Sequence, residues 1–569
     1  MRELINEALD YLVNNYPRVR VVLIEAPTGY GKTYNSHIPF LEFNKKGLAR
    51  GFIYVAPTRS LVRQQARDFL SKLQGYSISY QSMDINLEVQ VPNAGPVQLK
   101  KNPKLSSNVN ITTIDSFMFN LMRMPVESLN KPAKWRYMTY RSYIFTSYVF
   151  LDEVHLMVED SSITLASLLL GLYELILSAT PTVVATATLG DNRIKCLALG
   201  ECGSIKLGTY SSVKDSVRVF RLGNKESKDS IFITVRDKDW ESKTTEQIFQ
   251  FKELNNYKEI ISVIKEYGDR ILILTNTVKR AVDIYELVSE ELGDIALFHS
   301  KLDEYDRDAN AKIIDSAKVI VGTDAIGVGI NPKNVKILIM DIPPNVDTFI
   351  QRIGRICRNI DNDRDCTVYL LKDNENLPKY YLDNKDKLGS INWRLPYRCC
   401  GKEGYSALIN NYMPEPKLDV TAYQDLLSSL SFVIIEQEDL KKKYRRYCNL
   451  VRDSVIIRGI TKRDDPLIHS LPLSMEDAEK VIKEHGKEID IVAFLLHITD
   501  TDVNVNYLNI DDNDKKIIIR IIQDSNRNEC DRYFEINDLI NKKYSKPRDI
   551  IMWGLDVSRI YRSGIGLVI

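Results

Sequence analysis

A short glycine-containing loop near the start of the chain constrains its fold more than any other feature. Residues 21–24 read Val-Val-Leu-Ile, as a buried strand does, and residues 26–33 read Ala-Pro-Thr-Gly-Tyr-Gly-Lys-Thr. Two glycines let the chain turn so that successive backbone N–H groups face one point, and a following helix presents its positive end to that point. The pattern therefore predicts a strand, a phosphate-binding loop and a helix that together bind a nucleoside triphosphate.

Two side chains at the end of this loop have the chemistry that phosphates and their metal ion require. Lys32 can reach the β- and γ-phosphates, and the Thr33 hydroxyl is placed to ligate Mg²⁺. We therefore expect ATP and Mg²⁺ as cofactors. An ordinary glycine turn before a helix is the alternative for the loop taken alone. The nucleotide-binding residues expected from the loop are Thr28, Gly29, Tyr30, Gly31, Lys32 and Thr33.

Two adjacent carboxylates follow another apolar run, at residues 149–155, which read Val-Phe-Leu-Asp-Glu-Val-His. At the carboxyl end of a strand, Asp152 can hold Mg²⁺ directly or through water, and Glu153 can polarise the water that attacks the γ-phosphate. His155 is expected to couple this site to the neighbouring domain. A solvated acidic turn is the alternative.

A Thr-Ala-Thr tripeptide at residues 186–188 ends a strand-like run. A similar tripeptide, Ser-Ala-Thr at residues 178–180, precedes that run and is followed by proline, so its hydroxyls should lie at the opposite edge of the sheet. We therefore assign a coupling role to Thr186 and Thr188.

The second half of the chain repeats the alternation of strands and helices from about residue 270, which is typical of βαβ units in an α/β fold. Residues 351–358 read Gln-Arg-Ile-Gly-Arg-Ile-Cys-Arg, and a helix would place residues 351, 355 and 358 on one face. Arg355 and Arg358 are thus predicted to reach the γ-phosphate from a second domain as arginine fingers. A basic helix surface that binds a phosphate backbone is the alternative.

These segments, in this order, resemble the motifs of superfamily 2 DExH helicases, with residues 323–331, Thr-Asp-Ala-Ile-Gly-Val-Gly-Ile-Asn, as a further match. Thr-Ile-Asp at residues 113–115 and His-Ser-Lys at residues 299–301 are similar to the helicase part of the CRISPR-associated helicase-nuclease of type I systems. The resemblance covers about residues 15 to 375. Asn331 departs from the superfamily, which more often has Asp there.

The resemblance implies an α/β fold of two tandem RecA-like parallel-sheet domains with a mixed C-terminal accessory domain. The expected boundaries are residues 1–215 for the first, ATP-binding domain, 216–395 for the second domain and 396–569 for the accessory domain. Gly329 and Gln351 join the nucleotide site by the same resemblance. The residues expected to contact nucleic acid or to couple it to ATP are Thr58, Arg59, Thr113, His155, Thr186, Thr188, Ser300 and Thr323.

The function implied is that of a translocase moving 3′ to 5′ on single-stranded DNA, the strand displaced by a guide-RNA surveillance complex. None of the six histidines is followed by Asp, so by resemblance the chain is a stand-alone helicase subunit whose HD nuclease is a separate polypeptide. One alternative is another superfamily 2 enzyme, an RNA helicase or a repair DNA helicase, although no Gln precedes the loop, unlike in DEAD-box RNA helicases. A second alternative is a nucleotide-gated nucleic-acid-binding switch without net unwinding.

A net charge of +1 means that any positive surface for nucleic acid must be local. Basic and aromatic residues are interleaved at residues 131–143 and 441–447, which suits a single strand or, alternatively, a solvated helix whose rings face the core. No apolar run is long enough to span a membrane and the start lacks a signal sequence, so we expect a cytoplasmic protein without a membrane partner. Eight cysteines without a Cys-x-x-Cys pair indicate a reducing compartment.

Overall fold

The computed structural model describes most of the chain as alternating strands and helices. The described residues are 2–82, 87–91, 95–124, 136–158, 162–187, 189–224, 229–327, 332–372, 376–431, 437–448, 450–451, 454–498, 503–545 and 550–569. They form two compact units. The first unit takes its described residues from Met1–Val126, Trp135–Leu274 and Gly327–Val433, and the second from Thr275–Ile326 and Ile434–Ile569.

A ten-stranded sheet is the scaffold of the first unit. Its strands are β1 (Val21–Glu25), β2 (Gly51–Ala56), β3 (Ile78–Gln81), β4 (Leu87–Val91), β5 (Gly95–Lys101), β6 (Val109–Thr113), β7 (Ser147–Leu151), β8 (Thr182–Thr186), β11 (Val217–Leu222) and β12 (Phe232–Val235). Their order is β12-β11-β1-β8-β7-β2-β6-β3-β5-β4, with β4 and β5 antiparallel and the other neighbours parallel. The sheet continues past residue 215, the boundary expected for the first domain.

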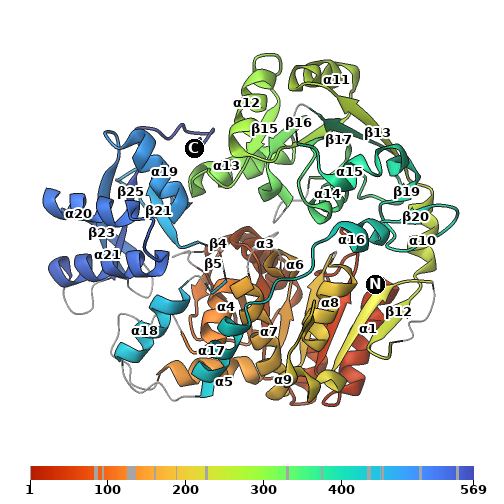
Figure 1. Ribbon diagram of the computed structural model, residues 1–569, viewed down its shortest axis with the longest axis horizontal. Coiled ribbons are helices and arrows are strands. Elements are labelled where there is room, and N and C mark those ends of the chain that lie inside the picture. The colour runs from red at the N-terminus through yellow and green to blue at the C-terminus, as the bar shows by residue number, and fades with distance from the viewer. Residues whose placement is uncertain are drawn as a thin grey trace. The chain divides into compact units, whose positions relative to one another are not determined.

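Helices cover this sheet on both faces (Figure 1). They are α1 (Glu3–Asn15), α2 (Ile38–Lys45), α3 (Arg59–Lys72), α4 (Ile114–Leu121), α5 (Arg136–Phe145), α6 (His155–Val158), α7 (Ser162–Leu177), α8 (Gly190–Leu199) and α9 (Gly208–Ser211). Phe52, Tyr54 and Phe150 share one buried cluster with residues of α1, α2 and α3. Because side chains alternate along a strand, the buried Ile53 and Val55 face the opposite layer. Such strands, buried on both faces, hold their carboxyl ends at one edge of the sheet.

A second sheet has six strands, which are β13 (Ile248–Leu254), β14 (Arg270–Leu274), β15 (Ile295–Phe298), β16 (Val319–Gly322), β17 (Val335–Asp341) and β18 (Asp365–Leu371). Their order is β13-β18-β17-β14-β16-β15, and they pair in parallel wherever their register is described. The boundary between the units falls after β14, so β15 and β16 belong to the second unit. The helices of this region are α10 (Lys238–Thr245), α11 (Ile260–Glu266), α12 (Val278–Ser289), α13 (Glu304–Ile314), α14 (Val346–Ile353), α15 (Lys379–Leu382) and α16 (Ser406–Tyr412). The next helix, α17 (Val420–Ser431), packs instead against α7 of the first sheet.

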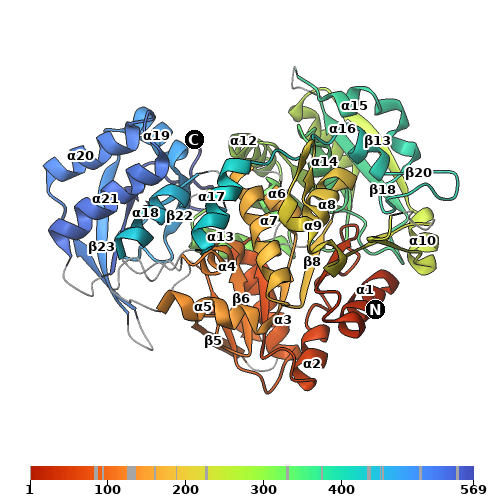
Figure 2. The ribbon, with the colours of Figure 1, turned by 60° about the horizontal axis from the view of Figure 1, so that its bottom comes forward.

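The C-terminal part contains a five-stranded sheet formed by β21 (Ile456–Ile460), β22 (Ser470–Ser474), β23 (Asp490–Ile498), β24 (Val503–Leu508) and β25 (Ile550–Asp556), in the order β22-β21-β25-β23-β24. β21 and β25 are parallel and the other neighbours are antiparallel. The helices α19 (Met475–His485), α20 (Asp512–Gln523) and α21 (Glu529–Tyr544) pack against the sheet (Figure 2). This part of the chain also contains α18 (Gln437–Tyr447). Two parallel-sheet regions followed by a mixed one confirm the predicted fold class.

The remaining described strands form two small two-stranded sheets. One pairs β9 (Glu201–Cys202) with β10 (Ile205–Lys206), and the other pairs β19 (Ile391–Asn392) with β20 (Glu403–Gly404). Cysteine pairing differs from the expectation of reduced thiols, because six cysteines form the disulfides Cys196–Cys202, Cys357–Cys366 and Cys448–Cys530. The pairs lie six, nine and 82 residues apart, so spacing gave no sign of them. Within the described ranges, no helix is both long and apolar enough to cross a membrane.

Candidate active site

The loop after β1 has the backbone of a phosphate-binding loop. Gly29 and Gly31 adopt φ angles of 83° and 93°, a conformation that residues with a Cβ rarely adopt. The Nζ of Lys32 donates to the Ala26 carbonyl at 3.0 Å, so its charge lies inside the loop. The helix begins later than the sequence predicts, at Ile38, because residues 32–37 form turns and a proline in the first helical turn favours a start there.

Thr33 and Asp152, the two predicted metal ligands, lie in direct contact. The Thr33 hydroxyl donates to Asp152 Oδ2 at 2.8 Å, and the Tyr54 hydroxyl reaches the same oxygen at 2.5 Å. The Glu153 backbone N–H donates to Asp152 Oδ1 at 3.0 Å. Burial and the neighbouring charge of Glu153 raise the pKa of Asp152 to about 6. A hydroxyl and a carboxylate are the oxygen ligands that Mg²⁺ prefers, so these residues fit the ion.

Glu153 lies among positive charges. It follows β7 with a φ of 49°, and its carboxylate oxygens lie 3.9 Å from Lys32 Nζ and 3.3 Å from His155 Nδ1. Burial alone would raise the pKa of Glu153, but the charges of Lys32 and of two arginines described below, together with that of His155 when it is protonated, outweigh burial and lower the pKa. Glu153 is therefore a carboxylate that can accept a hydrogen bond from water.

His155, the first residue of α6, links Glu153 to the end of β8. Its Nδ1 lies 3.5 Å from the hydroxyl of Thr186, and burial lowers its pKa. Thr186 ends β8, as the sequence predicts, whereas Thr180 precedes the strand and its hydroxyl donates to the Phe145 carbonyl at 3.4 Å. Thr188 lies outside the described residues.

Arg355 and Arg358 do not lie on a helix, so the prediction that they share a helix face with Gln351 is wrong. α14 ends at Ile353, which leaves Gln351 on the helix and both arginines in the turn after it. Cys357 has a φ of 49°, which a right-handed helix does not allow. The spacing of four and three residues therefore describes a turn here.

This arginine turn, residues 354–358, still lies against the nucleotide loop. A Cβ at Gly354 would meet Thr28 Cβ at 3.0 Å, so the approach is as close as glycine permits. The charges of Arg355 and Arg358 help to lower the pKa of Glu153, and burial lowers the pKa of Arg358. Both guanidinium charges therefore act on Glu153, the residue expected beside the γ-phosphate, as the position of an arginine finger requires.

Arg394 supports the arginine turn, and sequence reasoning missed it. Its buried guanidinium donates to the carbonyls of Gly354 at 3.2 Å, of Ile356, and of Cys357 at 3.1 Å, and to Gln247 at 3.3 Å. No signal in the sequence marks Arg394, since its partners are backbone carbonyls about 40 residues earlier.

The residues predicted to grip nucleic acid in the first half occupy the ends of neighbouring strands. Thr58 is the N-cap of α3 after β2, with Arg59 as the first helical residue, and Thr113 is the N-cap of α4 after β6. Because β2 and β6 pair in parallel, these ends share the sheet edge that carries Asp152 after β7. Gly329 lies outside the described residues.

Ser300 and Thr323 belong to the second unit. The exposed Ser300 follows β15, and Thr323 follows β16, where its backbone N–H donates to the Phe298 carbonyl at 3.3 Å. Parallel pairing of β15 and β16 places both residues at one edge. Their roles stay predictions.

The last residues of the chain bind the segment that contains Ser300. His299 Nε2 lies 2.7 Å from the Ile565 carbonyl, and the backbone N–H of Leu567 donates to the Lys301 carbonyl at 3.0 Å. Burial lowers the pKa of His299 to about 4. The C-terminal part thus holds the predicted nucleic-acid segment in place.

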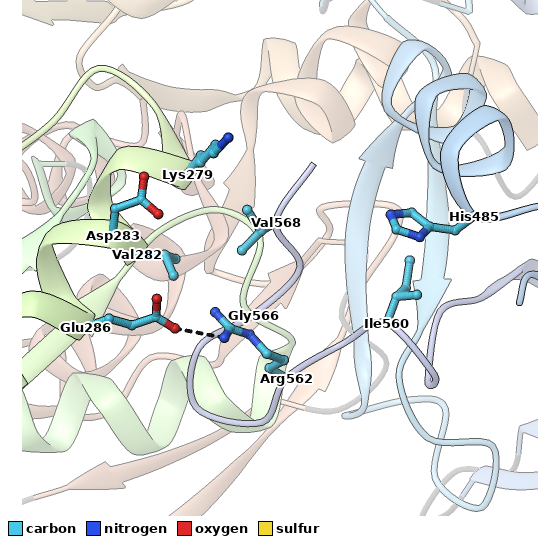
Figure 3. A pocket seen from close by; sticks show the side chains of 9 residues that line it. All are labelled: Lys279, Val282, Asp283, Glu286, His485, Ile560, Arg562, Gly566 and Val568. Carbon is cyan, nitrogen blue, oxygen red and sulfur yellow. Dashed lines mark hydrogen bonds and ion pairs between the residues drawn. The ribbon is translucent and has the colours of Figure 1, made fainter.

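A small pocket of about 170 Å³ lies beside this contact, between α12, α19 and the last residues of the chain (Figure 3). Arg562 and Glu286 line it and form an ion pair of 2.8 Å. None of the residues predicted from the sequence lines this pocket.

The basic and aromatic run at residues 441–447 fits the alternative explanation, a solvated helix whose rings face the core. Tyr444 and Tyr447 are 2% and 6% exposed, and Arg445 pairs with Asp538 at 2.6 Å. Rings that face the core cannot stack on bases. Part of the other run, residues 131–135, lies outside the described residues.

Comparison with known families agrees with this geometry. Residues 6–195 match the family of the DEAD/DEAH box helicases, and residues 222–359 match the helicase conserved C-terminal domain. Residues 6–195 and 222–359 are thus the two domains of a superfamily 2 helicase. Helicase domains of this kind bind a nucleotide.

Two curated relatives illustrate the range of similar proteins. The CRISPR-associated helicase Cas3 of Thermoproteus tenax is 26% identical over 353 residues, which are 60% of this chain and 54% of the relative. The probable ATP-dependent RNA helicase ddx52 of Dictyostelium discoideum is 24% identical over 393 residues, which are 68% of this chain and 51% of the relative. The helicase thus spans about half the length of the curated relatives it matches.

Two solved structures share the fold. T. fusca Cas3 with AMPPNP has a TM-score of 0.55 at 15% identity and covers 82% of this chain and 64% of its own. The DUF1998 helicase MrfA bound to DNA has a TM-score of 0.51 at 13% identity and covers 89% of this chain and 77% of its own.

Proposed function

We propose that this helicase is an ATP-driven motor that moves 3′ to 5′ on single-stranded DNA in type I CRISPR interference. The observation that carries the motor is the convergence of Thr33, Asp152, Glu153 and the arginine turn at one sheet edge within the first unit. Similarity to the Cas3 of Thermoproteus tenax supports the CRISPR assignment. The structural likeness to T. fusca Cas3 supports the fold on which the motor is built.

Each group at this edge has a part in ATP hydrolysis. Lys32 and the loop backbone bind the phosphates, while Thr33 and Asp152 would hold Mg²⁺, which neutralises phosphate charge when bound. Glu153 orients the attacking water. The charge that develops on the γ-phosphate is met by Arg355 and Arg358.

The contact of His155 with Thr186 offers a route from the ATP site to the nucleic-acid strand. Any movement of Glu153 during hydrolysis would reach the end of β8 through the imidazole, whose Nδ1 lies 3.3 Å from Glu153 and within hydrogen-bond distance of Thr186. Thr58 and Thr113 lie at the same sheet edge, where they would grip the strand backbone. Alternating grips on the strand would turn hydrolysis into translocation.

The test compares ATPase and strand-displacement rates on matched DNA and RNA duplexes with 3′ or 5′ overhangs. We expect stimulation by single-stranded DNA of any sequence, a steep loss of stimulation with salt, and unwinding only from a 3′ overhang. Lys32→Ala is the control for ATP-independent melting. Unwinding from the 5′ overhang alone would contradict the proposed direction.

A second candidate is an RNA helicase, favoured by the similarity to the probable RNA helicase ddx52. Strong stimulation by RNA with none by DNA would support this candidate and remove the CRISPR assignment. ATP-dependent clamping of DNA without strand displacement would instead support the nucleotide-gated switch.

The partners proposed are a guide-RNA surveillance complex and a separate HD nuclease subunit. The chain carries no His-Asp dipeptide, and among the described residues no group of three or more His, Cys, Asp or Glu side chains could hold a metal ion. We expect plasmid degradation only when both partners and ATP are added. Metal-dependent cleavage by the purified helicase, lost on changing His469, His485 or His497, would contradict the separate nuclease.

A further inference from the structure

A buried tyrosine lies against the carboxylate that would hold the metal ion. Tyr54 is the fourth residue of β2, next to β7 in the sheet, and it is fully buried. Its hydroxyl lies 2.5 Å from Asp152 Oδ2, the oxygen that also accepts from Thr33. Two hydroxyls therefore converge on one carboxylate oxygen in the centre of the sheet edge.

Aromatic neighbours restrain the ring of Tyr54 and with it the direction of its hydroxyl. The ring stacks on Phe150 with centroids 5.8 Å apart and planes 11° apart, and it meets Phe69 edge to face at 5.5 Å. A ring enclosed in this way keeps its hydroxyl aimed at the carboxyl end of β7 whatever binds in the loop. The side chain of Asp152, in contrast, can rotate about its own side-chain torsions unless neighbouring groups restrain it.

We propose that Tyr54 is a positioning residue that fixes the Asp152 carboxylate in the orientation needed to bind Mg²⁺. The inference rests on the proposed ATP and Mg²⁺ site. A carboxylate has about four acceptor sites, so the bonds from Tyr54 and Thr33 to Oδ2 and from the Glu153 backbone to Oδ1 restrain it and leave one site free. Outer groups that orient a metal ligand contribute about 10- to 100-fold to metal affinity or activity.

A purely structural role for the hydroxyl is the competing explanation, and the chain offers a matched control. Tyr148 lies on the adjacent strand β7, is also fully buried, and stacks on Phe52 at 5.4 Å. Its hydroxyl has no hydrogen-bond partner among the described residues. Tyr148→Phe thus removes a buried phenol oxygen of the same sheet without touching Asp152.

The experiment measures Mn²⁺ binding to the ADP complex of the full chain by electron paramagnetic resonance, with Mn²⁺ in place of Mg²⁺. We expect Tyr54→Phe to weaken Mn²⁺ binding about 10-fold and to raise the half-saturating Mg²⁺ concentration of the ATPase by a similar factor. At saturating Mg²⁺, kcat should return to within about twofold of wild type, because the chemical groups remain. Tyr148→Phe should bind Mn²⁺ as wild type does.

A third variant restores the donor and tests the same point if Tyr54→Phe folds poorly. Incorporating 4-aminophenylalanine at position 54 keeps an N–H donor on a ring of the same shape, so it should return Mn²⁺ affinity to within about threefold of wild type. Unchanged Mn²⁺ affinity in Tyr54→Phe, or no recovery with the amino ring, would overturn the proposal. If the wild-type ADP complex itself binds no Mn²⁺, the proposed metal site is wrong and the inference falls with it.

Discussion

Asp152→Asn should stabilise the protein in the absence of nucleotide and metal while abolishing ATP hydrolysis. The pKa of Asp152 is raised from 3.8 to about 6, because burial and Glu153 disfavour its charge. At 1.36 kcal/mol per pH unit, keeping this carboxylate ionised in the folded state at pH 7 costs about 3 kcal/mol. The neutral amide removes that cost. Its oxygen can still accept from Tyr54 and Thr33, whereas its nitrogen faces the Glu153 N–H, so about 3 kcal/mol is the largest gain expected.

The sign of this effect fixes its pH dependence. Because the folded-state pKa is above the ordinary value, the wild-type protein loses stability as pH rises from about 4 through 6. The advantage of Asp152→Asn should therefore be largest at pH 7, about half as large at pH 5, and about a fifth as large at pH 4.

Thermal unfolding of both proteins at pH 7 and pH 5 checks this, with an expected gain of about 5 °C at pH 7. Glu153→Gln is a control in which the change in stability should have the opposite sign. The pKa of Glu153 is lowered, so its charge stabilises the fold above its ordinary pKa and removing that charge should lower the melting temperature. An Asp152→Asn protein that melts below wild type at pH 7, or by the same margin at both pH values, would refute the reasoning.

Three further predictions address the chemistry. Lys32→Ala and Glu153→Gln should both abolish ATP turnover, while Glu153→Gln still binds ATP in equilibrium dialysis; substantial hydrolysis by Lys32→Ala would contradict the site. Arg355→Ala and Arg358→Ala should each lower kcat on the order of 10³-fold with little change in ATP affinity, and wild-type rates in both would exclude the arginine turn from catalysis. Arg394→Met removes the guanidinium that donates to three carbonyls of that turn, so kcat should fall at least 10-fold, although Gln247 still donates to the Cys357 carbonyl and Arg358 to that of Gly354. Unchanged kcat in the folded variant would show that the turn holds its shape without Arg394.

The sequence by itself determined which residues could meet at one sheet edge. Apolar runs that end in Asp-Glu or Thr predict buried parallel strands, and such strands align their carboxyl ends. Thr33, Asp152, Glu153 and Thr186 therefore come together as the pattern predicts, and the alternation of strands and helices predicted the fold class. Their chemical roles stay predictions.

Local backbone geometry was harder to predict. The spacing of Arg355 and Arg358 suited a helix, yet α14 ends at Ile353, and a disulfide joins Cys357 to Cys366 in β18. The helix after the nucleotide loop likewise starts only at Ile38. Helix ends depend on capping and on contacts beyond the local sequence, which a periodic pattern does not contain.

Only the tertiary structure decided which polar groups serve the site from a distance. Tyr54 reads in the sequence as one more residue of an apolar strand, because its partner Asp152 lies 98 residues later. Arg394 gives no signal either, since its partners are backbone carbonyls, which every residue has whatever its side chain. A buried hydroxyl or guanidinium takes whatever partner the packing brings within reach, so its role is set by the fold and not by its neighbours in the chain.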